Sequence, residues 1–115
     1  MIKGQHRVVI YGLRTCPVCQ RAHKALKVAG REVQFRDVRA EPLSEVELAE
    51  LLAEFGNRLV DRKTNDYRSL NIWLKNAEAE AQIVAQPKVM VRPIIRDQEN
   101  LYLGWDTEVE NALLA

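Results

Sequence analysis

The 115-residue sequence lacks long apolar runs, an excess of charge of either sign, and all but two cysteines. No apolar stretch approaches the ~18 residues that a membrane-spanning helix needs. The net charge is +1, so the overall charge favours binding to neither nucleic acid nor a membrane surface. A hydrophobic content of 47% and a charged content of 29% are typical of one soluble globular domain with a single core.

The first residues also lack the features of a secretory signal. The segment MIKGQHRVVIYG has neither an apolar core nor a small-residue cleavage site. We therefore expect a cytoplasmic protein. Thiols in that compartment are mostly reduced, so a cysteine pair there is more often catalytic, redox-sensing or metal-binding than structural.

The two cysteines, Cys16 and Cys19, form a CxxC motif between a predicted strand and a predicted helix. Residues 7–11 (RVVIY) are β-branched or aromatic and predict a buried strand. Pro17 suits the first turn of the helix that follows. Residues 33–38 (VQFRDV) predict a second strand, and the helical connection makes it parallel to the first.

The next segment has a mostly helical pattern. Ser44 opens a capping box before a helix that ends at Gly56. Asn65 or Asp66 is the predicted cap of a second helix, and residues 77–85 predict a third.

Strand patterns then return. A polar turn at residues 97–100 is so short that the strands on either side of it must be antiparallel. Asp106 or Thr107 is the predicted cap of a last helix. The predicted strand segments of this region are residues 89–91, 94–95 and 101–103.

The element order is β-α-β, a helical insert, then β-β-α, with the CxxC motif at the first strand-to-helix turn. This order predicts an α/β protein of the thioredoxin-like fold, with a mixed four-stranded sheet and an inserted helical subdomain. We expect one domain over residues 1–115. Its thioredoxin-like core would span about residues 7–40 and 88–115, and its helical insert about residues 41–87.

Cys16 directly precedes the predicted helix, where free N–H groups and the helix dipole stabilise a thiolate. A cysteine attacks as its thiolate, and Arg14 and Arg21 would add to this effect. Cys19 shares the same helix face, one turn further on. We assign Cys16 as the nucleophile and Cys19 as the resolving thiol of thiol–disulfide exchange. Two inert core cysteines are the alternative, which the start of a helix disfavours.

A metal site is not expected. Structural zinc needs four ligands, and the cysteine pair and the two histidines, His6 and His23, offer no second ligand pair at the usual spacing. We expect His23 to be a surface or half-buried residue of the first helix.

Arg92-Pro93 is the second informative pair. A thioredoxin-like fold carries a cis-proline after its helical segment, packed opposite the CxxC motif. Placing Pro93 there explains a proline between apolar strand segments, where it removes a hydrogen-bond donor, and directs Arg92 at Cys16. The alternative is an edge-strand proline beside a solvated arginine.

Four stretches between about Val8 and Trp105 together resemble the arsenate reductase (ArsC)/Spx family. They are VIYGLRTCPVCQRAHKAL, FRDVRAEPLSEVELAELLAEFG, LVDRKTNDYRSL and QPKVMVRPII. The resemblance implies a reactive cysteine at Cys16 and oxyanion-holding arginines at Arg62 and Arg92. Guanidinium groups bind oxyanions bidentately, and a cation beside sulfur favours the thiolate. The candidate substrate-binding residues are Arg14, Arg62, Arg92 and Pro93.

The chain departs from the glutathione-dependent arsenate reductases at two places. They carry a third arginine near the last strand, where this chain has residues 101–105 (LYLGW), and a histidine where it has Gly12. The YG pair at residues 11–12 is more similar to the YffB-like branch, which usually lacks the second cysteine. The CxxC motif is a feature of Spx, a redox-sensing transcription regulator that binds the RNA polymerase α subunit. Proline within the motif resembles glutaredoxins.

These features favour a thiol-dependent reductase that uses glutathione, or a glutaredoxin or thioredoxin partner, with arsenate as one candidate substrate. We expect a monomer with no bound cofactor, no direct nucleic-acid partner and no membrane partner. The alternative is an Spx-like regulator that binds RNA polymerase, with the Cys16–Cys19 pair as a disulfide switch. Its basic stretch would comprise Arg58, Arg62, Lys63 and Arg68.

Overall fold

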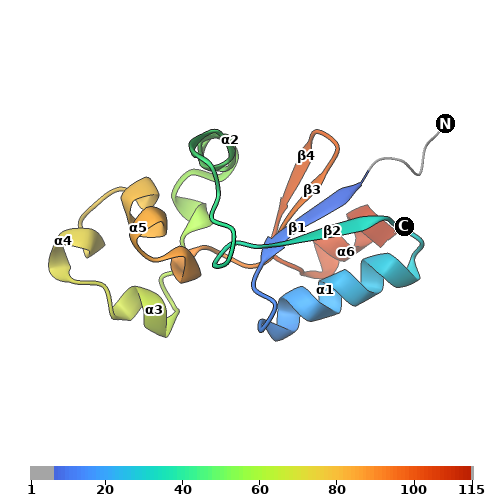
Figure 1. Ribbon diagram of the computed structural model, residues 1–115, viewed down its shortest axis with the longest axis horizontal. Helices are drawn as coiled ribbons and strands as arrows, with labels where there is room; N and C mark the ends of the chain where they lie inside the picture. The colour runs from blue at the N-terminus through green and yellow to red at the C-terminus, as the bar shows by residue number, and fades with distance from the viewer. Residues whose placement is uncertain (1–6, 115) are drawn as a thin grey trace. The chain divides into compact units, whose positions relative to one another are not determined.

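The computed structural model describes residues 7–114 (Figure 1). The chain divides into two compact units. One contains the residues up to Val38 and from Arg92 onward, and the other is Arg39–Val91. No helix within the described residues is long and apolar enough to cross a membrane.

The first unit contains a mixed four-stranded sheet with the strand order β2-β1-β3-β4. Strand β1 (Val8–Gly12) is parallel to β2 (Val33–Asp37) and antiparallel to β3 (Ile94–Asp97), which pairs antiparallel with β4 (Asn100–Leu103). The helix α1 (Pro17–Val28) connects β1 to β2. The predicted α/β class, the parallel pair and the hairpin are therefore confirmed.

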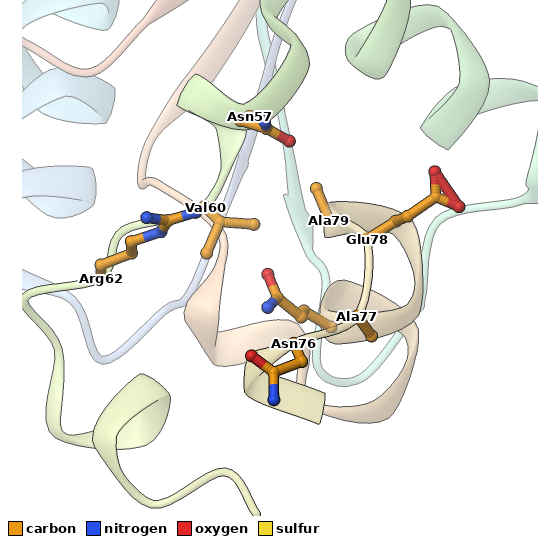
Figure 2. A pocket seen from close by; sticks show the side chains of 8 residues that line it. Asn57, Val60, Arg62, Asn76, Ala77, Glu78 and Ala79 are labelled. Carbon is orange, nitrogen blue, oxygen red and sulfur yellow. The ribbon is translucent and has the colours of Figure 1, made fainter. Parts of the chain in front are cut away.

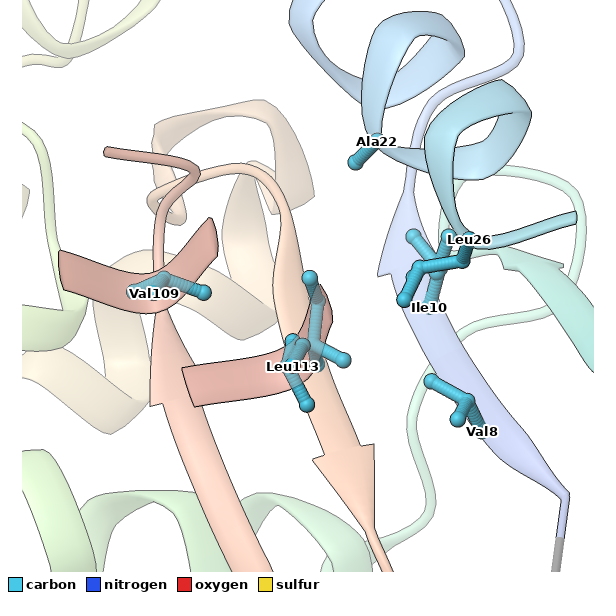
Figure 3. Packing of buried hydrophobic residues seen from close by; sticks show 7 residues of the cluster. Val8, Ile10, Ala22, Leu26, Val109 and Leu113 are labelled. Carbon is cyan, nitrogen blue, oxygen red and sulfur yellow. The ribbon is translucent and has the colours of Figure 1, made fainter. Parts of the chain in front are cut away.

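Two helices, α1 and α6 (Thr107–Leu114), pack together against one face of this sheet (Figures 1 and 3). Side chains at alternate positions of the strands meet the apolar stripes of both helices, as period-2 and helical spacing require. This packing holds α1 against the sheet. The CxxC motif at the start of α1 is therefore held at the end of β1. The buried cluster consists of Val8, Ile10, Ala22, Leu26, Ile95, Val109 and Leu113.

The second unit is helical. Its first helix, α2 (Glu45–Phe55), begins at the predicted capping box: the Glu47 N–H donates to the Ser44 hydroxyl at 3.1 Å, and the Ser44 N–H donates to the Glu47 carboxylate at 2.8 Å. Gly56 ends α2, as predicted. The later elements are η2 (Gly56–Leu59), α3 (Asn65–Arg68), α4 (Ile72–Lys75), α5 (Ala79–Ala85) and η3 (Pro87–Val89).

The predicted helix cap at Asn65 or Asp66 is wrong. Thr64 caps α3, because its hydroxyl accepts a hydrogen bond from the Tyr67 N–H at 3.0 Å. The helix also stops after one turn. Asn71 caps a separate short helix, α4, because its side-chain oxygen accepts a bond from the Leu74 N–H at 2.9 Å.

Residues 89–91 do not form the predicted strand. Val89 ends the 3-10 turn η3, and Met90 forms only an isolated antiparallel bridge with Val60. The hairpin turn is also tighter than predicted, because Asp97 and Asn100 are already paired in the ladder. At the last helix, Asp106 is the cap, since its carboxylate accepts a bond from the Val109 N–H at 2.9 Å.

Candidate active site

Cys16 occupies the N-cap position of α1, with extended backbone angles. A turn in which the Cys16 N–H donates to the Leu13 carbonyl at 3.0 Å leads the chain from β1 into the helix. Pro17, the first helical residue, has no N–H to donate. The next free N–H groups of the helix, those of Val18 and Cys19, therefore face the partly exposed Cys16 sulfur.

Opposing effects determine the pKa of Cys16. Burial is the largest single effect and raises the pKa. The backbone N–H groups of Cys19 and Val18, the Cys19 thiol and the Arg92 guanidinium all interact with the sulfur and together outweigh burial. The pKa of Cys16 is therefore lowered, in the direction that the sequence predicted. A lowered pKa increases the thiolate fraction at neutral pH.

The pKa of Cys19 is shifted in the opposite direction. Its side chain is fully buried, and burial raises the pKa of Cys19 to about 12 against an opposing interaction with the Leu13 backbone. The neighbouring Cys16 sulfur acts in the same direction as burial, because one S–H group and one thiolate are favoured over two thiolates. Both cysteines are free thiols, so the pair is in its reduced form.

The Arg92-Pro93 peptide bond is cis, as predicted. Pro93 is buried and directly precedes β3, which is an internal strand, so the edge-strand alternative is wrong. Its carbonyl accepts a hydrogen bond from the Gly104 N–H at 2.7 Å. Arg92 is half-buried, and its guanidinium interacts with the Cys16 sulfur.

The other predicted arginines lie elsewhere. The Arg14 guanidinium lies over the ring of Phe35, 5.3 Å from the ring centroid, while the Arg14 N–H donates to the Asp37 carboxylate at 3.0 Å. Arg21 is exposed on α1. The structure thus brings Cys16, Cys19 and Arg92 together in the first unit, with Pro93 next to Arg92 in the chain and Arg14 in the loop before Cys16.

Arg62 belongs to the second unit. It is exposed and lines a pocket of about 280 Å³ with the side chains of Asn57, Asn76 and Gln82 (Figure 2). Gln82 is buried, and its amide nitrogen donates to the Leu74 carbonyl at 2.8 Å. The pocket is therefore rich in amide groups and contains one guanidinium and one carboxylate, that of Glu78.

Phe35 is a neighbour of the CxxC loop that the sequence analysis did not single out. Its ring lies beneath the Arg14 guanidinium and close to His23, with a ring-centroid distance of 5.4 Å to His23. The only available signal was its inward position in β2, opposite Ile10. Residue type alone does not identify such a contact.

His23 is half-buried on α1, as predicted. Burial lowers the pKa of His23, and the charges of Lys27 and Arg14 lower it further. His6 lies outside the described residues. Among residues 7–114, no group of three or more His, Cys, Asp or Glu side chains is placed to hold a metal ion.

The glutaredoxin family model matches residues 8–64. The chain is also 26% identical, over 117 aligned residues, to the protein named global transcriptional regulator Spx 2 of Lactococcus lactis. That alignment covers 93% of this chain and 86% of the relative.

Among solved structures, a protein titled YffB has a TM-score of 0.84 and 25% identity, covering 94% of this chain and 99% of that one. An arsenate reductase (ArsC) related protein from Brucella melitensis has a TM-score of 0.73 and 26% identity, covering 96% of this chain and 97% of that one. An arsenate reductase from Vibrio cholerae shares the fold, with a TM-score of 0.76, 23% identity, and coverage of 95% and 98%. These comparisons together support an ArsC/Spx/YffB-like family with a thioredoxin-like fold for this chain.

Proposed function

We propose that the protein is a thiol–disulfide oxidoreductase in which Cys16 is the nucleophile and Cys19 the resolving thiol. The observation that carries this proposal is the opposite direction of the two pKa shifts: the pKa of Cys16 is lowered, and that of Cys19 is raised to about 12. Near neutral pH the attacking thiolate is then Cys16, and Cys19 holds its proton until the second step.

The proposed reaction has two exchange steps. The Cys16 thiolate attacks one sulfur of a glutathione mixed disulfide, a new bond forms between Cys16 and glutathione, and the substrate leaves as a thiolate that takes up a proton. Cys19 then loses its proton and attacks the Cys16 sulfur. The Cys16–Cys19 disulfide forms, and glutathione leaves and takes up the proton that Cys19 gave up.

Two glutathione molecules would complete the cycle. They supply the two electrons that reduce the Cys16–Cys19 disulfide, and they leave as oxidised glutathione, so no bound cofactor is needed. A glutaredoxin or thioredoxin dithiol would be an equivalent donor. This chemistry requires a compartment with reduced glutathione, such as the cytoplasm.

In this proposal Arg92 holds the Cys16 thiolate and an anionic group of the substrate, because its guanidinium already interacts with the sulfur. Pro93 and Arg14, which belong to the same unit as Cys16, are proposed to line the substrate site. Arg62 belongs to the second unit. A mixed disulfide is favoured over arsenate as the substrate. The segment β4 is Asn100–Leu103 and offers no arginine to complete an oxyanion site.

The test is NADPH consumption in an assay coupled to glutathione and glutathione reductase, with either a small glutathione mixed disulfide or arsenate as substrate. The variant Cys16→Ser should abolish turnover. Cys19→Ser, the same chemical change one helical turn away, should retain the first step. Without added glutathione, which would cleave the mixed disulfide, this variant should accumulate the mixed disulfide on Cys16. Turnover that survives in Cys16→Ser, or is absent from the unmodified chain with both substrates, contradicts the proposal.

A second candidate is a redox-responsive regulator, favoured by the relative named global transcriptional regulator Spx 2. The Cys16–Cys19 disulfide would then be a switch, and the RNA polymerase α subunit the candidate partner. The exposed residues Arg58, Arg62, Lys63 and Arg68 are available for such an interface. Equal binding of the purified α subunit to the reduced and the oxidised chain would contradict this candidate.

A further inference from the structure

The last residue of β1, Gly12, lies against the side chain of Cys19. A Cβ atom at position 12 would lie 2.5 Å from the Cys19 sulfur and 3.3 Å from the Cys19 Cβ. Ordinary contacts between such atoms are about 3.5–4.0 Å. Gly12 is not among the glycines with positive φ, so its backbone angles do not require glycine. In this chain, the Cys19 side chain leaves no room for a side chain at position 12.

Neither partner can move away easily. Gly12 is held in the sheet, where it pairs with Asp37 and its carbonyl accepts a hydrogen bond from the Val38 N–H at 3.0 Å. Cys19 is 0% exposed in the first turn of α1, where helix sterics leave few side-chain rotamers. The Phe35 ring lies 3.7 Å from the same Cβ position and limits the space on another side.

We propose that Gly12 is a positioning residue that leaves the volume for the Cys19 sulfur and so sets its reach towards Cys16. This inference rests on the proposed role of Cys19 as the resolving thiol. Any side chain at position 12 competes with the sulfur for one volume. The sulfur must then leave the position from which it interacts with Cys16, or α1 must shift relative to β1. Either change affects the second exchange step more than the first, because the atoms nearest to the added Cβ belong to Cys19 and Phe35.

The experiment uses Gly12→Ala in the full chain. Its first readout is the rate at which a preformed Cys16–glutathione mixed disulfide releases glutathione, measured by quenched mass spectrometry. A 1 Å misplacement of a reacting group can cost about 100-fold, so we expect release to slow at least about tenfold. The rate of alkylation of Cys16 by iodoacetamide should change far less. Release at the unmodified rate overturns the proposal.

The second readout is a double-mutant cycle in stability between Gly12→Ala and Cys19→Ala. Removing the Cys19 sulfur frees the volume that the sulfur and the added Cβ would both occupy. Gly12→Ala should therefore lower the unfolding midpoint much less in the Cys19→Ala background than in the unmodified chain. An equal loss in both backgrounds overturns the proposal. If Gly12→Ala alone does not fold, folding of the double variant supports the proposal, and failure of the double variant to fold contradicts it.

The two readouts separate this inference from the proposed function. A wild-type mixed disulfide that never releases glutathione contradicts the role of Cys19 as the resolving thiol. The unfolding measurements need no catalysis, so they test the steric pairing of Gly12 and Cys19 by themselves.

Discussion

Arg92, in the segment that leads into β3, interacts with the sulfur of Cys16 at the start of α1. The two residues are distant in the sequence and meet because β1 and β3 are neighbours in the sheet. The interaction favours the charged form of the thiol, since a guanidinium stabilises a thiolate and gains little from a neutral S–H group.

Replacing Arg92 by alanine should therefore raise the pKa of Cys16. Loss of a charge-assisted hydrogen bond should slow alkylation of Cys16 at neutral pH by roughly tenfold. The measurement is the thiolate absorbance of the unmodified and variant chains as a function of pH, with Cys16→Ser as the blank.

Arg14→Ala is the matched control for this prediction. It removes the same charge from the same unit, but its guanidinium lies over the Phe35 ring. The pKa of Cys16 should then change less than in Arg92→Ala. Equal shifts in the two variants would show that Cys16 responds to overall positive charge and not to contact with Arg92.

The sequence predicted those features that depend on residues close together in the chain. The helix at Cys16, the capping box at Ser44 and the parallel strand predicted at residues 33–38 all follow from local spacing, and the structure contains them, the strand over Val33–Asp37. The cis bond at Arg92-Pro93 followed from the expected fold.

The wrong predictions arose where several residues compete for one role. Thr64, Asn65 and Asp66 can all cap a helix, and their types do not show which one does. Residues 89–91 have strong strand propensity, but the turn at Pro87 places them outside the sheet, where tertiary structure overrides propensity.

Some features of the site could not be predicted because they are contacts between distant segments. The position of Arg14 depends on the Phe35 ring in β2, and the space at Gly12 depends on the path of α1. A sequence pattern fixes the elements that carry these residues. It does not fix the distances between side chains on different elements.

The core of the first unit predicts a contrast between two residues of α1. Leu26 lies in the buried cluster (Figure 3) and is 0% exposed. Val28 is 80% exposed. Leu26→Ala should lower the free energy of unfolding by about 2–5 kcal/mol, and Val28→Ala by less than about 0.5 kcal/mol. Urea denaturation checks both values, and similar losses in the two variants would contradict this packing.

Cys16 should make the reduced protein more stable as the pH rises towards 8.5. Its pKa is lowered in the folded state, so between that pKa and about 8.5 the unfolded chain binds one more proton than the folded one. The free energy of unfolding then increases with pH and reaches its full gain above the unfolded pKa. Chemical denaturation under reducing conditions should show this rise in the unmodified chain and lose it in Cys16→Ser. An identical pH profile for both chains would contradict the lowered pKa.

Cys19 should have the opposite effect at higher pH. Its folded pKa is about 12, so above about 8.5 the thiol ionises in the unfolded chain while it stays protonated in the folded one. The folded state then binds the extra proton, and the free energy of unfolding falls by up to about 1.4 kcal/mol per pH unit. Other groups titrate in this range, so the measurement is the difference between the unmodified chain and Cys19→Ala at each pH. The free energy of unfolding of the unmodified chain, relative to that of Cys19→Ala, should fall steadily above pH ~8.5, and a relative value that does not change with pH would mean that the Cys19 thiol ionises as readily in the fold as in the unfolded chain.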